Sequence, residues 1–489
     1  MRSAVADRSK TVVAPHLIDG REDAEAEPEP VLDAPDHQEY ARAPRAGGDA
    51  VEAAVMAAGR ALETAWRGST AAQRARVLNG AAEALRAHRA AIANDVVLES
   101  GKPIGQAESE VERAASALEV FAATAHAVTG TVVDRSSVRA WGFELREPVG
   151  VVGVIGTWNL PIQLGALKVG AALAAGCTVV VKPSPLAPLA ALHLVRALHE
   201  AGLPRGAASV VQGEEATAQA LIGADGVNAI SFTGRDSTGR EVMALAARGP
   251  KKVILELGGK SANVVFADAD LDAAARGIVA GIARNQGATC TAGSRILVDR
   301  RVAGDVLERV TALVRELRVG DPFERATEVG AIRTQALGDL LRQELREAED
   351  RGGAVVCGGE DVDVPGREGT YIRPAVVAGL KPGDRLAVQE LFGPIGVVFE
   401  FDSFDEALAL ANASRYGLAA GIWSRDLATI RRAWSRLDVG TVYVNSYHRI
   451  DGLPLTSGGR KASGFGLEGG LRGVEELLTT KSVHFPVDE

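Results

Sequence analysis

The sequence predicts an α/β protein with a Rossmann-type, doubly wound parallel sheet, a second α/β domain and a small β arm. Between residues 149 and 257, short apolar runs alternate about five times with helical segments. The run Val149–Ile155 is continuous and rich in β-branched residues, which is typical of a strand buried on both faces. Pro161 suits the first turn of the next helix, and Gly176 ends that helix. Strand–helix units joined by short connections predict a parallel sheet with helices on both faces.

The segment before this series is predicted to be mainly helical. Apolar residues recur at helical spacing from Asp49 to Glu99, and a further helix is expected over Glu108–His126. The Gly-Lys-Pro sequence at 101–103 marks the stop between them. At the N-terminus, residues 1–16 are predicted to form a flexible arm and the acidic segment Glu22–Pro30 a solvated loop.

Strands and helices alternate in two series, the first over residues 149–257 and the second over residues 260–455. In the first series we expect strands at Thr178–Val181, Ala208–Gln212, Val227–Phe232 and Lys252–Leu257, and helices at Leu186–Gly202, Ala216–Gly223 and Ser237–Ala247. In the second series, over residues 260–455, we expect strands at Asn263–Phe266, Arg295–Val298, Ala375–Ala378, Ile395–Glu400, Leu418–Trp423 and Gly440–Val444. A strand pair within Thr129–Glu147 and a terminal strand at Leu478–Phe485 lie outside both series, as expected of an arm that pairs with a partner subunit.

Composition excludes several classes of protein. A chain of 489 residues is long enough for two or three domains. A net charge of -9 and an aromatic content of 4% argue against nucleic acid or an anionic membrane as a partner. Three widely spaced cysteines without a CxxC indicate neither a disulfide framework nor a zinc site, and they fit a reducing cytoplasm. No segment has the pattern of a signal peptide or a transmembrane helix.

Cys290 and Glu256 are the most informative pair of residues. Cys290 is flanked by small and polar residues, so a small molecule can reach its thiol. Glu256 precedes Gly258 and Gly259, which leave room for water beside its carboxylate. A nucleophile that forms an acyl-enzyme and a carboxylate that activates water are the minimum needed to turn a carbonyl compound into an acid. For Cys290 alone, a small buried core residue is the alternative.

Further motifs, in chain order, resemble those of the aldehyde dehydrogenase superfamily across about residues 15–485. They are Thr157–Pro161, Lys182–Ser184, Phe232–Gly234, Leu255–Lys260, Asn285–Cys290, Glu390–Pro394, Tyr416–Leu418 and Ser457–Gly464. The resemblance implies a cofactor domain at residues 17–128 and 148–257, a catalytic domain at 258–456, and an oligomerisation arm at 129–147 and 470–489. It further implies a homodimer or homotetramer, with a small-molecule aldehyde as the substrate.

The resemblance also assigns roles to individual residues. Cys290 is expected to be the nucleophile, Glu256 the base for deacylation and Asn159 a donor to the oxyanion. Asn159 is also well placed to be the N-cap of the helix that begins at Pro161, and this role is compatible with donation to the oxyanion. The alternative for Glu256 is a surface carboxylate at the end of a strand. The expected contacts to the cofactor are Lys182, Ser184, Trp158, Gly234, Glu390 and Phe392. For Phe392 the alternative is a core aromatic residue.

Departures from the family pattern concern the cofactor and the substrate. Pro185 stands where the family has a Glu that binds the ribose diol, and Arg235 stands in place of a Ser. Without that Glu, discrimination against NADP should weaken, so NADP is possible. We expect NAD as the preferred cofactor because Lys182 is retained and no dedicated phosphate site is evident. Leu160 and Ser457 occupy positions that are often Phe, so we expect a less aromatic substrate tunnel.

Two residues near the predicted tunnel bear on the substrate. Arg284 matches an arginine that binds the substrate carboxylate in succinic-semialdehyde dehydrogenases, but their second arginine falls at Leu167. The alternative for Arg284 is a surface arginine. His448 is expected in a substrate-entrance loop, with a structural rather than a catalytic role.

The sequence thus predicts oxidation of an aldehyde to an acid with NAD(P) through a thiohemiacetal and a thioester on Cys290. The alternatives are a semialdehyde dehydrogenase that uses Arg284, a CoA-acylating enzyme and a catalytically silent structural protein. Retention of Glu256 argues against the CoA-acylating enzyme. Cys290 and Glu256 are retained together with Asn159, Lys182 and Glu390, which argues against a catalytically silent structural protein.

Overall fold

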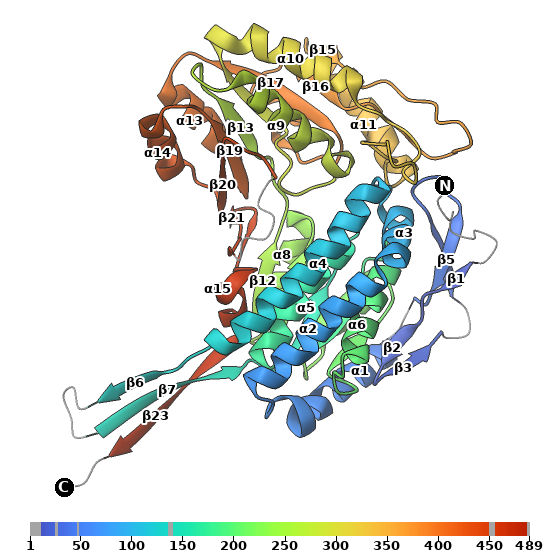
Figure 1. The fold of residues 1–489 in the computed structure, drawn as a ribbon, viewed down its shortest axis with the longest axis vertical. Coiled ribbons are helices and arrows are strands. Elements are labelled where there is room, and N and C mark those ends of the chain that lie inside the picture. The colour runs from blue at the N-terminus through green and yellow to red at the C-terminus, as the bar shows by residue number, and fades with distance from the viewer. Residues whose placement is uncertain (1–10, 25–27, 46–47, 135–139, 449–454, 487–489) are drawn as a thin grey trace.

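The computed structural model describes residues 11–24, 28–45, 48–134, 140–448 and 455–486. Two large sheets, each covered by helices, form the body of the molecule, and a three-stranded arm projects from it (Figure 1). The predicted α/β class, with two α/β units and a β arm, is confirmed. No helix in the described part of the chain is long and apolar enough to cross a membrane.

The first sheet has eight strands, and its five central strands are parallel. In spatial order they are β22 (Gly464–Phe465), β12 (Lys252–Glu256), β11 (Ala229–Thr233), β8 (Val151–Ile155), β9 (Thr178–Lys182), β10 (Ala208–Val210), β2 (His16–Ile18) and β3 (Arg21–Asp23). The chain runs outward from β8 through β9 to β10, and then returns to β11 and β12 on the other side. This order is that of a Rossmann-type sheet, with its reversal point between β8 and β11.

Helices pack on both faces of this sheet because successive strand residues point to opposite sides. Val152 and Val154 of β8 belong to one core, and Val151 and Ile155 belong to the other. The first core is completed by α2 (Ala71–Ala87), α3 (Arg89–Ser100), α4 (Ile104–Thr124), α5 (Pro161–Ala175) and α6 (Leu189–Glu200). The second is completed by α1 (Gly48–Ala61), α7 (Glu215–Gly223) and α8 (Asp236–Ala246). The sheet is therefore doubly wound, as predicted.

The second sheet has seven strands, all parallel except for one edge strand. In spatial order they are β15 (Ala354–Cys357), β16 (Ala375–Ala378), β17 (Ile395–Phe401), β14 (Arg295–Asp299), β13 (Ala262–Val265), β19 (Ala419–Trp423) and β20 (Thr441–Val444). One face packs on α9 (Leu271–Ala283) and α10 (Ala303–Glu316), the other on α11 (Gln335–Asp350), α13 (Phe404–Asn412) and α14 (Leu427–Arg436). The six predicted strands are confirmed, and the antiparallel edge strand β15 was not predicted.

The arm is an antiparallel sheet of β6 (Thr131–Asp134), β7 (Ala140–Pro148) and β23 (Leu478–Pro486). The pairing of β23 with β7 runs from Leu478 opposite Pro148 to Pro486 opposite Ala140. The predicted strand pair and the terminal strand are confirmed, and they form one sheet that extends away from the body (Figure 1).

The predictions for the N-terminal region were partly wrong. Residues 1–10 lie outside the described residues, but β1 (Val12–Val13) pairs with β5 (Glu39–Ala43), and β2 pairs with β10. The predicted loop Glu22–Pro30 contains the end of β3 and the start of β4 (Glu29–Leu32). The backbone partner of β2 is nearly two hundred residues away in β10, so the local pattern of side chains does not reveal this pairing.

Candidate functional site

Three predicted site residues lie at the carboxyl ends of the parallel strands in the first sheet. Lys182 is the last residue of β9 and lies opposite Ile155 of β8. Glu256 is the last residue of β12 and lies opposite Thr233 of β11. The backbone N–H of Gly234 donates to the carbonyl of Glu256 at 3.1 Å. Because β8 and β11 flank the reversal of strand order, this is the edge at which doubly wound sheets bind ligands.

The loop that carries Cys290 has a strained backbone. Asn285 and Gln286 have φ values of 51° and 54°, and Gly287 follows with 73°. A non-glycine residue in this left-handed region costs of order 1–3 kcal/mol, so the surrounding structure must hold it there. The side-chain amide of Asn285 does so by donating to the carbonyl of Ala288 at 2.9 Å.

Distant segments supply the other supports of this loop. The Gln286 amide donates to the carbonyls of Ser100 at 3.2 Å and Ala331 at 3.0 Å. The backbone N–H of Asn285 donates to the side chain of Gln106 at 3.0 Å. A Cβ at Gly287 would overlap the backbone of the Gly393–Pro394 segment. The Asn-Gln-Gly and Phe-Gly-Pro sequences therefore pack directly against each other.

Gly258 and Gly259 join the two sheets at the site. The backbone N–H of Gly259 donates to Oε1 of Glu390 at 2.9 Å. A Cβ at Gly258 would overlap the Glu390 carboxylate, and a Cβ at Gly259 would overlap the carbonyl oxygen of Cys290. The absence of side chains just after Glu256 is what lets both Glu390 and the Cys290 loop approach the end of the first sheet.

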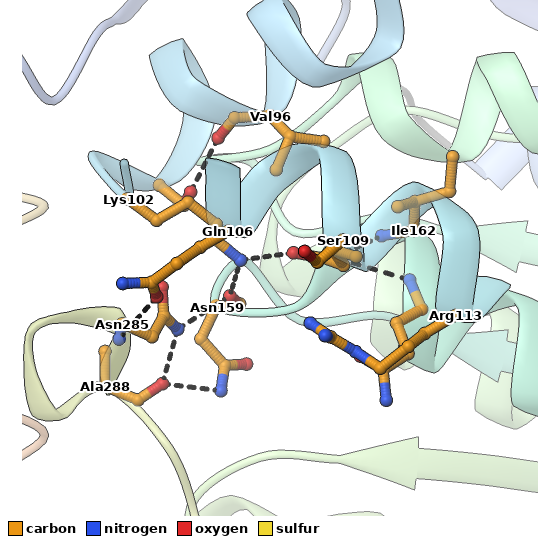
Figure 2. A network of polar contacts seen from close by, with 12 residues as sticks. Val96, Lys102, Gln106, Ser109, Arg113, Asn159, Ile162, Asn285 and Ala288 are labelled. Atoms are coloured by element: carbon orange, nitrogen blue, oxygen red, sulfur yellow. Dashed lines mark hydrogen bonds and ion pairs between the residues drawn. The ribbon is translucent and has the colours of Figure 1, made fainter. Parts of the chain in front are cut away.

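Asn159 does not cap helix α5. Its amide nitrogen donates to the carbonyl of Ala288 at 2.9 Å, and its amide oxygen accepts from the hydroxyl of Thr157 at 2.9 Å. Ala288 is two residues before Cys290, so this bond holds Asn159 beside the Cys290 loop (Figure 2). The amide has two N–H groups, so one of them remains available for a ligand.

A buried ion pair takes the capping role instead. Oε1 of Glu110 accepts from the backbone N–H groups of Ile162 and Gln163 at 3.2 and 3.3 Å. Its other oxygen is paired with Lys102, and both side chains are almost completely buried. Lys102 also donates to the carbonyl of Asn159 at 2.7 Å. This pair fixes the backbone on which Asn159 is carried, and sequence reasoning missed it.

The thiol of Cys290 is protonated in this environment. Burial and the nearby Glu390 and Glu256 carboxylates raise its pKa to about 12. The backbone N–H groups of Thr291 and of Cys290 itself act in the opposite direction, since they stabilise negative charge on the sulfur. The thiol therefore needs a base to accept its proton, and the same N–H groups can stabilise an anion that forms beside it.

Glu256 has a pKa suited to that task. Burial first, and then repulsion from Glu468, raise its pKa to about 8, while Lys168 opposes the shift. One carboxyl oxygen of Glu256 is buried without a hydrogen-bond partner among the described residues. Glu468 forms a buried ion pair with Lys168, whose ammonium also donates to Ser231 at 3.1 Å. Glu256 can thus gain or lose a proton close to neutral pH.

A pocket of about 130 Å³ lies in front of Cys290. Leu160 and Arg284 are among its lining residues, as predicted, together with Tyr443 and His448. His448 contacts the hydroxyl of Thr291 at 3.1 Å, and Arg284 donates to the carbonyl of His448 at 2.9 Å. Residues 449–454, which include the end of the predicted entrance loop, lie outside the described residues.

Two other residues considered for the substrate lie elsewhere. Ser457 is exposed and is not part of the pocket lining, and its backbone pairs with Glu468. Leu167 packs against the first core.

The remaining predicted residues are those expected to bind the cofactor. The Lys182 side chain is buried, its ammonium has no hydrogen-bond or ion-pair partner in the described part of the chain, and burial lowers its pKa to about 8. Phe392 has a left-handed φ of 59°, which is rare for a bulky residue. Its ring packs edge-on against Trp158, with 5.8 Å between the ring centroids. The Ser184 hydroxyl accepts from the backbone N–H of Leu186 at 3.3 Å. An unpaired cation, the Glu390 carboxylate and an aromatic wall fit a ligand with hydroxyl groups and a planar ring.

Known proteins resemble this chain over nearly its whole length. A betaine aldehyde dehydrogenase of Cereibacter sphaeroides (strain ATCC 17029 / ATH 2.4.9) is 37% identical, covering 97% of this chain and 98% of the relative. The 4-trimethylaminobutyraldehyde dehydrogenase B of Danio rerio is 35% identical, covering 94% and 89%. The crystal structure of PnpE from Pseudomonas sp. WBC-3 in complex with nicotinamide adenine dinucleotide superposes with a TM-score of 0.94, at 35% identity and coverage of 97% and 98%. Residues 21–483 match the aldehyde dehydrogenase family. The chain therefore belongs to the aldehyde dehydrogenase family and is an oxidoreductase that acts on aldehydes.

Proposed function

We propose that this enzyme oxidises a small aldehyde to the carboxylic acid with NAD, through covalent intermediates on Cys290. The observation that carries the proposal is the approach of the Cys290 loop and the Glu390 carboxylate to the two glycines that follow Glu256. The backbone N–H of Gly259 donates to Glu390, and a Cβ at Gly259 would overlap the carbonyl oxygen of Cys290. Asn159, bonded to the Cys290 loop at Ala288, supplies a neutral donor at the same place.

The reaction follows from these groups. The sulfur of Cys290 attacks the aldehyde carbon, and its proton passes to Glu256. The resulting oxyanion accepts hydrogen bonds from the Asn159 amide and the backbone N–H of Cys290. Loss of a hydride from carbon then leaves a thioester, and NAD, when bound, would accept that hydride.

Glu256 acts again in the second half of the reaction. After it has released the first proton to solvent, it takes a proton from a water molecule, which attacks the thioester carbon. The C–S bond breaks, the acid leaves, and Cys290 is regenerated. A pKa of about 8 suits this role, because the same carboxyl group must accept a proton twice in each cycle and release it twice.

Lys182, Ser184, Trp158, Gly234, Glu390 and Phe392 would hold the cofactor. The unpaired Lys182 ammonium at the end of β9 supports a contact with ribose hydroxyls, and Glu390 supports a contact with the second ribose. Pro185 is exposed and carries no charge to repel a 2′-phosphate, so use of NADP as well remains part of the proposal.

Residues 17–128 and 148–257 would bind the cofactor, and residues 258–456 would carry the nucleophile. Residues 129–147 and 470–489 would form an arm for assembly into a homodimer or homotetramer. Exposed apolar side chains on the arm support this role. They are Val132, Val133, Trp141, Leu145, Val483 and Phe485. Three free cysteines, one of them the nucleophile, suit a reducing cytoplasm.

The covalent mechanism is tested with two variants and a panel of aldehydes, with and without CoA. Cys290→Ala should abolish formation of reduced cofactor while cofactor binding persists. Glu256→Gln should slow both the first release of reduced cofactor and steady-state turnover, because Glu256 accepts a proton in both half-reactions. Aldehyde oxidation by Cys290→Ala within tenfold of the native rate would refute the assignment of the nucleophile. Turnover that requires CoA would indicate the acylating alternative.

A further inference from the structure

The loop of residues 183–188 connects β9 to α6 directly after Lys182, and it contains Ser184. Three of its six residues are prolines, which have no backbone N–H. The N–H groups of Leu186 and Ala187 are used inside the loop, where they donate to the hydroxyl and to the carbonyl of Ser184. Other parts of the molecule can therefore hold this loop mainly through its carbonyl groups.

Two buried side chains donate to those carbonyls. The Arg333 guanidinium donates to the carbonyl of Leu186 at 2.8 Å, and the Gln212 amide donates to the carbonyl of Pro188 at 3.1 Å. Gln212 follows β10 of the first sheet, whereas Arg333 precedes α11, which covers the second sheet. Arg333 is only 3% exposed. It thus holds the loop from the α/β unit that also carries Cys290.

Leu186 links Arg333 to the expected cofactor contacts. Its carbonyl accepts from Arg333, and its N–H donates to the hydroxyl of Ser184 at 3.3 Å. Because both bonds are made by one residue, a displacement of Leu186 would move Ser184 with it. Lys182 would also be affected, since only Pro183 separates it from Ser184.

The environment of Arg333 keeps its charge inside the protein. A buried guanidinium is costly unless anionic or polar groups lie near it. Burial lowers the pKa of Arg333, and Tyr40 and Glu99 are among the groups that oppose that shift. Glu99 is completely buried too, and its Oε1 accepts from the backbone N–H groups of Leu189 and Ala190 at the start of α6. Arg333 therefore holds the loop, and Glu99 holds the helix that follows it.

We infer that Arg333 is a positioning residue for the cofactor, because it fixes the loop of residues 183–188 and with it the polar groups of Lys182 and Ser184. The inference rests on the proposed function, in which Lys182 and Ser184 contact the cofactor. Arg333 acts through the loop and contacts neither the aldehyde nor the reacting atoms. Its loss should therefore weaken cofactor binding and leave the chemistry at Cys290 unchanged.

A purely structural role for Arg333 predicts a different result. The carbonyl of Ala331, two residues before Arg333, accepts from the Gln286 amide in the Cys290 loop at 3.0 Å. General disorder around Arg333 should therefore disturb the Cys290 loop as well as the loop of residues 183–188. The rate at which iodoacetamide alkylates Cys290 without cofactor, followed by mass spectrometry, reports on the Cys290 loop alone.

The first experiment measures NAD binding by calorimetry without aldehyde, and then kcat and both KM values with the best aldehyde of the panel. Arg333→Met keeps the approximate length of the side chain and removes the donor. We expect NAD to bind about tenfold more weakly and its KM to rise by a similar factor. The values of kcat, of KM for the aldehyde and of the Cys290 alkylation rate should stay within about twofold of native.

A matched control and a conservative variant accompany this substitution. Arg373 is another partly buried arginine near the second sheet, and it also donates to backbone carbonyls, those of Val314 and Leu317. Arg373→Met should leave NAD binding unchanged. Arg333→Lys keeps the charge but not the planar guanidinium, so its NAD affinity should lie between those of Arg333→Met and the native enzyme.

Three results would overturn the inference and leave the proposed function intact. They are native NAD affinity in Arg333→Met, equal weakening in Arg373→Met, and a change in Cys290 alkylation as large as the change in NAD affinity. If Arg333→Met does not fold, native NAD affinity in Arg333→Lys would overturn it.

A double variant tests the route through Lys182. If Arg333 acts by positioning Lys182, the combination of Lys182→Met and Arg333→Met should bind NAD little more weakly than Lys182→Met alone. Fully additive losses would mean that Arg333 acts elsewhere, and would overturn the inference. Native NAD affinity in Lys182→Met would instead refute the proposed cofactor contact, and the inference with it.

Discussion

Substitution of Glu256 by glutamine should stabilise the folded enzyme, and the gain should increase with pH. Burial and Glu468 raise the pKa of Glu256 from 4.5 to about 8 on folding. The unfolded chain therefore binds fewer protons than the folded one between pH 4.5 and about pH 8. Because stability falls with rising pH wherever the folded state binds more protons, Glu256 makes the native enzyme progressively less stable across this window.

The size of the effect follows from the same values. One pKa unit corresponds to about 1.4 kcal/mol, so the full loss above pH 8 is roughly 5 kcal/mol. Between about pH 5.5 and pH 8 it is roughly 3 kcal/mol. Glutamine does not titrate, and so Glu256→Gln lacks this loss. The new amide N–H groups can cost about 1–3 kcal/mol if they remain unpaired, but that cost does not vary with pH.

The quantity to measure is therefore how the difference in unfolding free energy between Glu256→Gln and the native enzyme changes with pH, and not the size of that difference at one pH. Unfolding by urea or heat, without cofactor, is measured for the native enzyme and Glu256→Gln at about pH 5.5 and pH 8. Glu241→Gln is the control, since Glu241 is an exposed residue on α8. We expect the stability of Glu256→Gln relative to the native enzyme to rise with pH, and that of the control to stay flat. A difference that is constant or falls with pH would refute a raised pKa at Glu256.

Three further predictions concern other residues of the candidate site. Glu468→Gln removes a negative charge beside Glu256, so the acidic limb of the kcat profile should move to lower pH; an unchanged limb would contradict the electrostatic link. Glu110→Gln leaves Lys102 buried without its anion, and should cost about 3–5 kcal/mol in urea unfolding; a loss under 1 kcal/mol would mean that the pair is dispensable. Pro185→Glu should raise the ratio of kcat/KM for NAD over NADP by about two decades through repulsion of the 2′-phosphate, and no change would place that phosphate elsewhere.

The parts of the fold that the sequence predicted are those with local signals. The β-branched run before Pro161 and the glycine at 176 define β8 and α5 within two residues of the observed bounds. Strands such as β2 were missed because their pairing partner lies far along the chain.

The residues of the candidate site also divide into those that the sequence predicted and those that it did not. Cys290 and Glu256 were found because they stand in short, specific motifs. Glu110, Lys168 and Glu468 were missed because isolated charged residues in amphipathic or loop segments look like surface residues. Their function is visible only once folding has buried them against one another.

The segment after Glu256 shows why the site needs both sheets at once. Glu256 ends a strand of the first sheet, and three residues later Gly259 donates to Glu390 and lies against the carbonyl of Cys290. A side chain at either glycine would overlap the Cys290 loop or the Glu390 carboxylate. The approach of the Cys290 loop to the end of the first sheet therefore depends on close backbone contact at Gly259. One requirement, that Cys290 lies at a fixed position relative to Glu256, explains both the two glycines and the strained backbone of Asn285–Gly287.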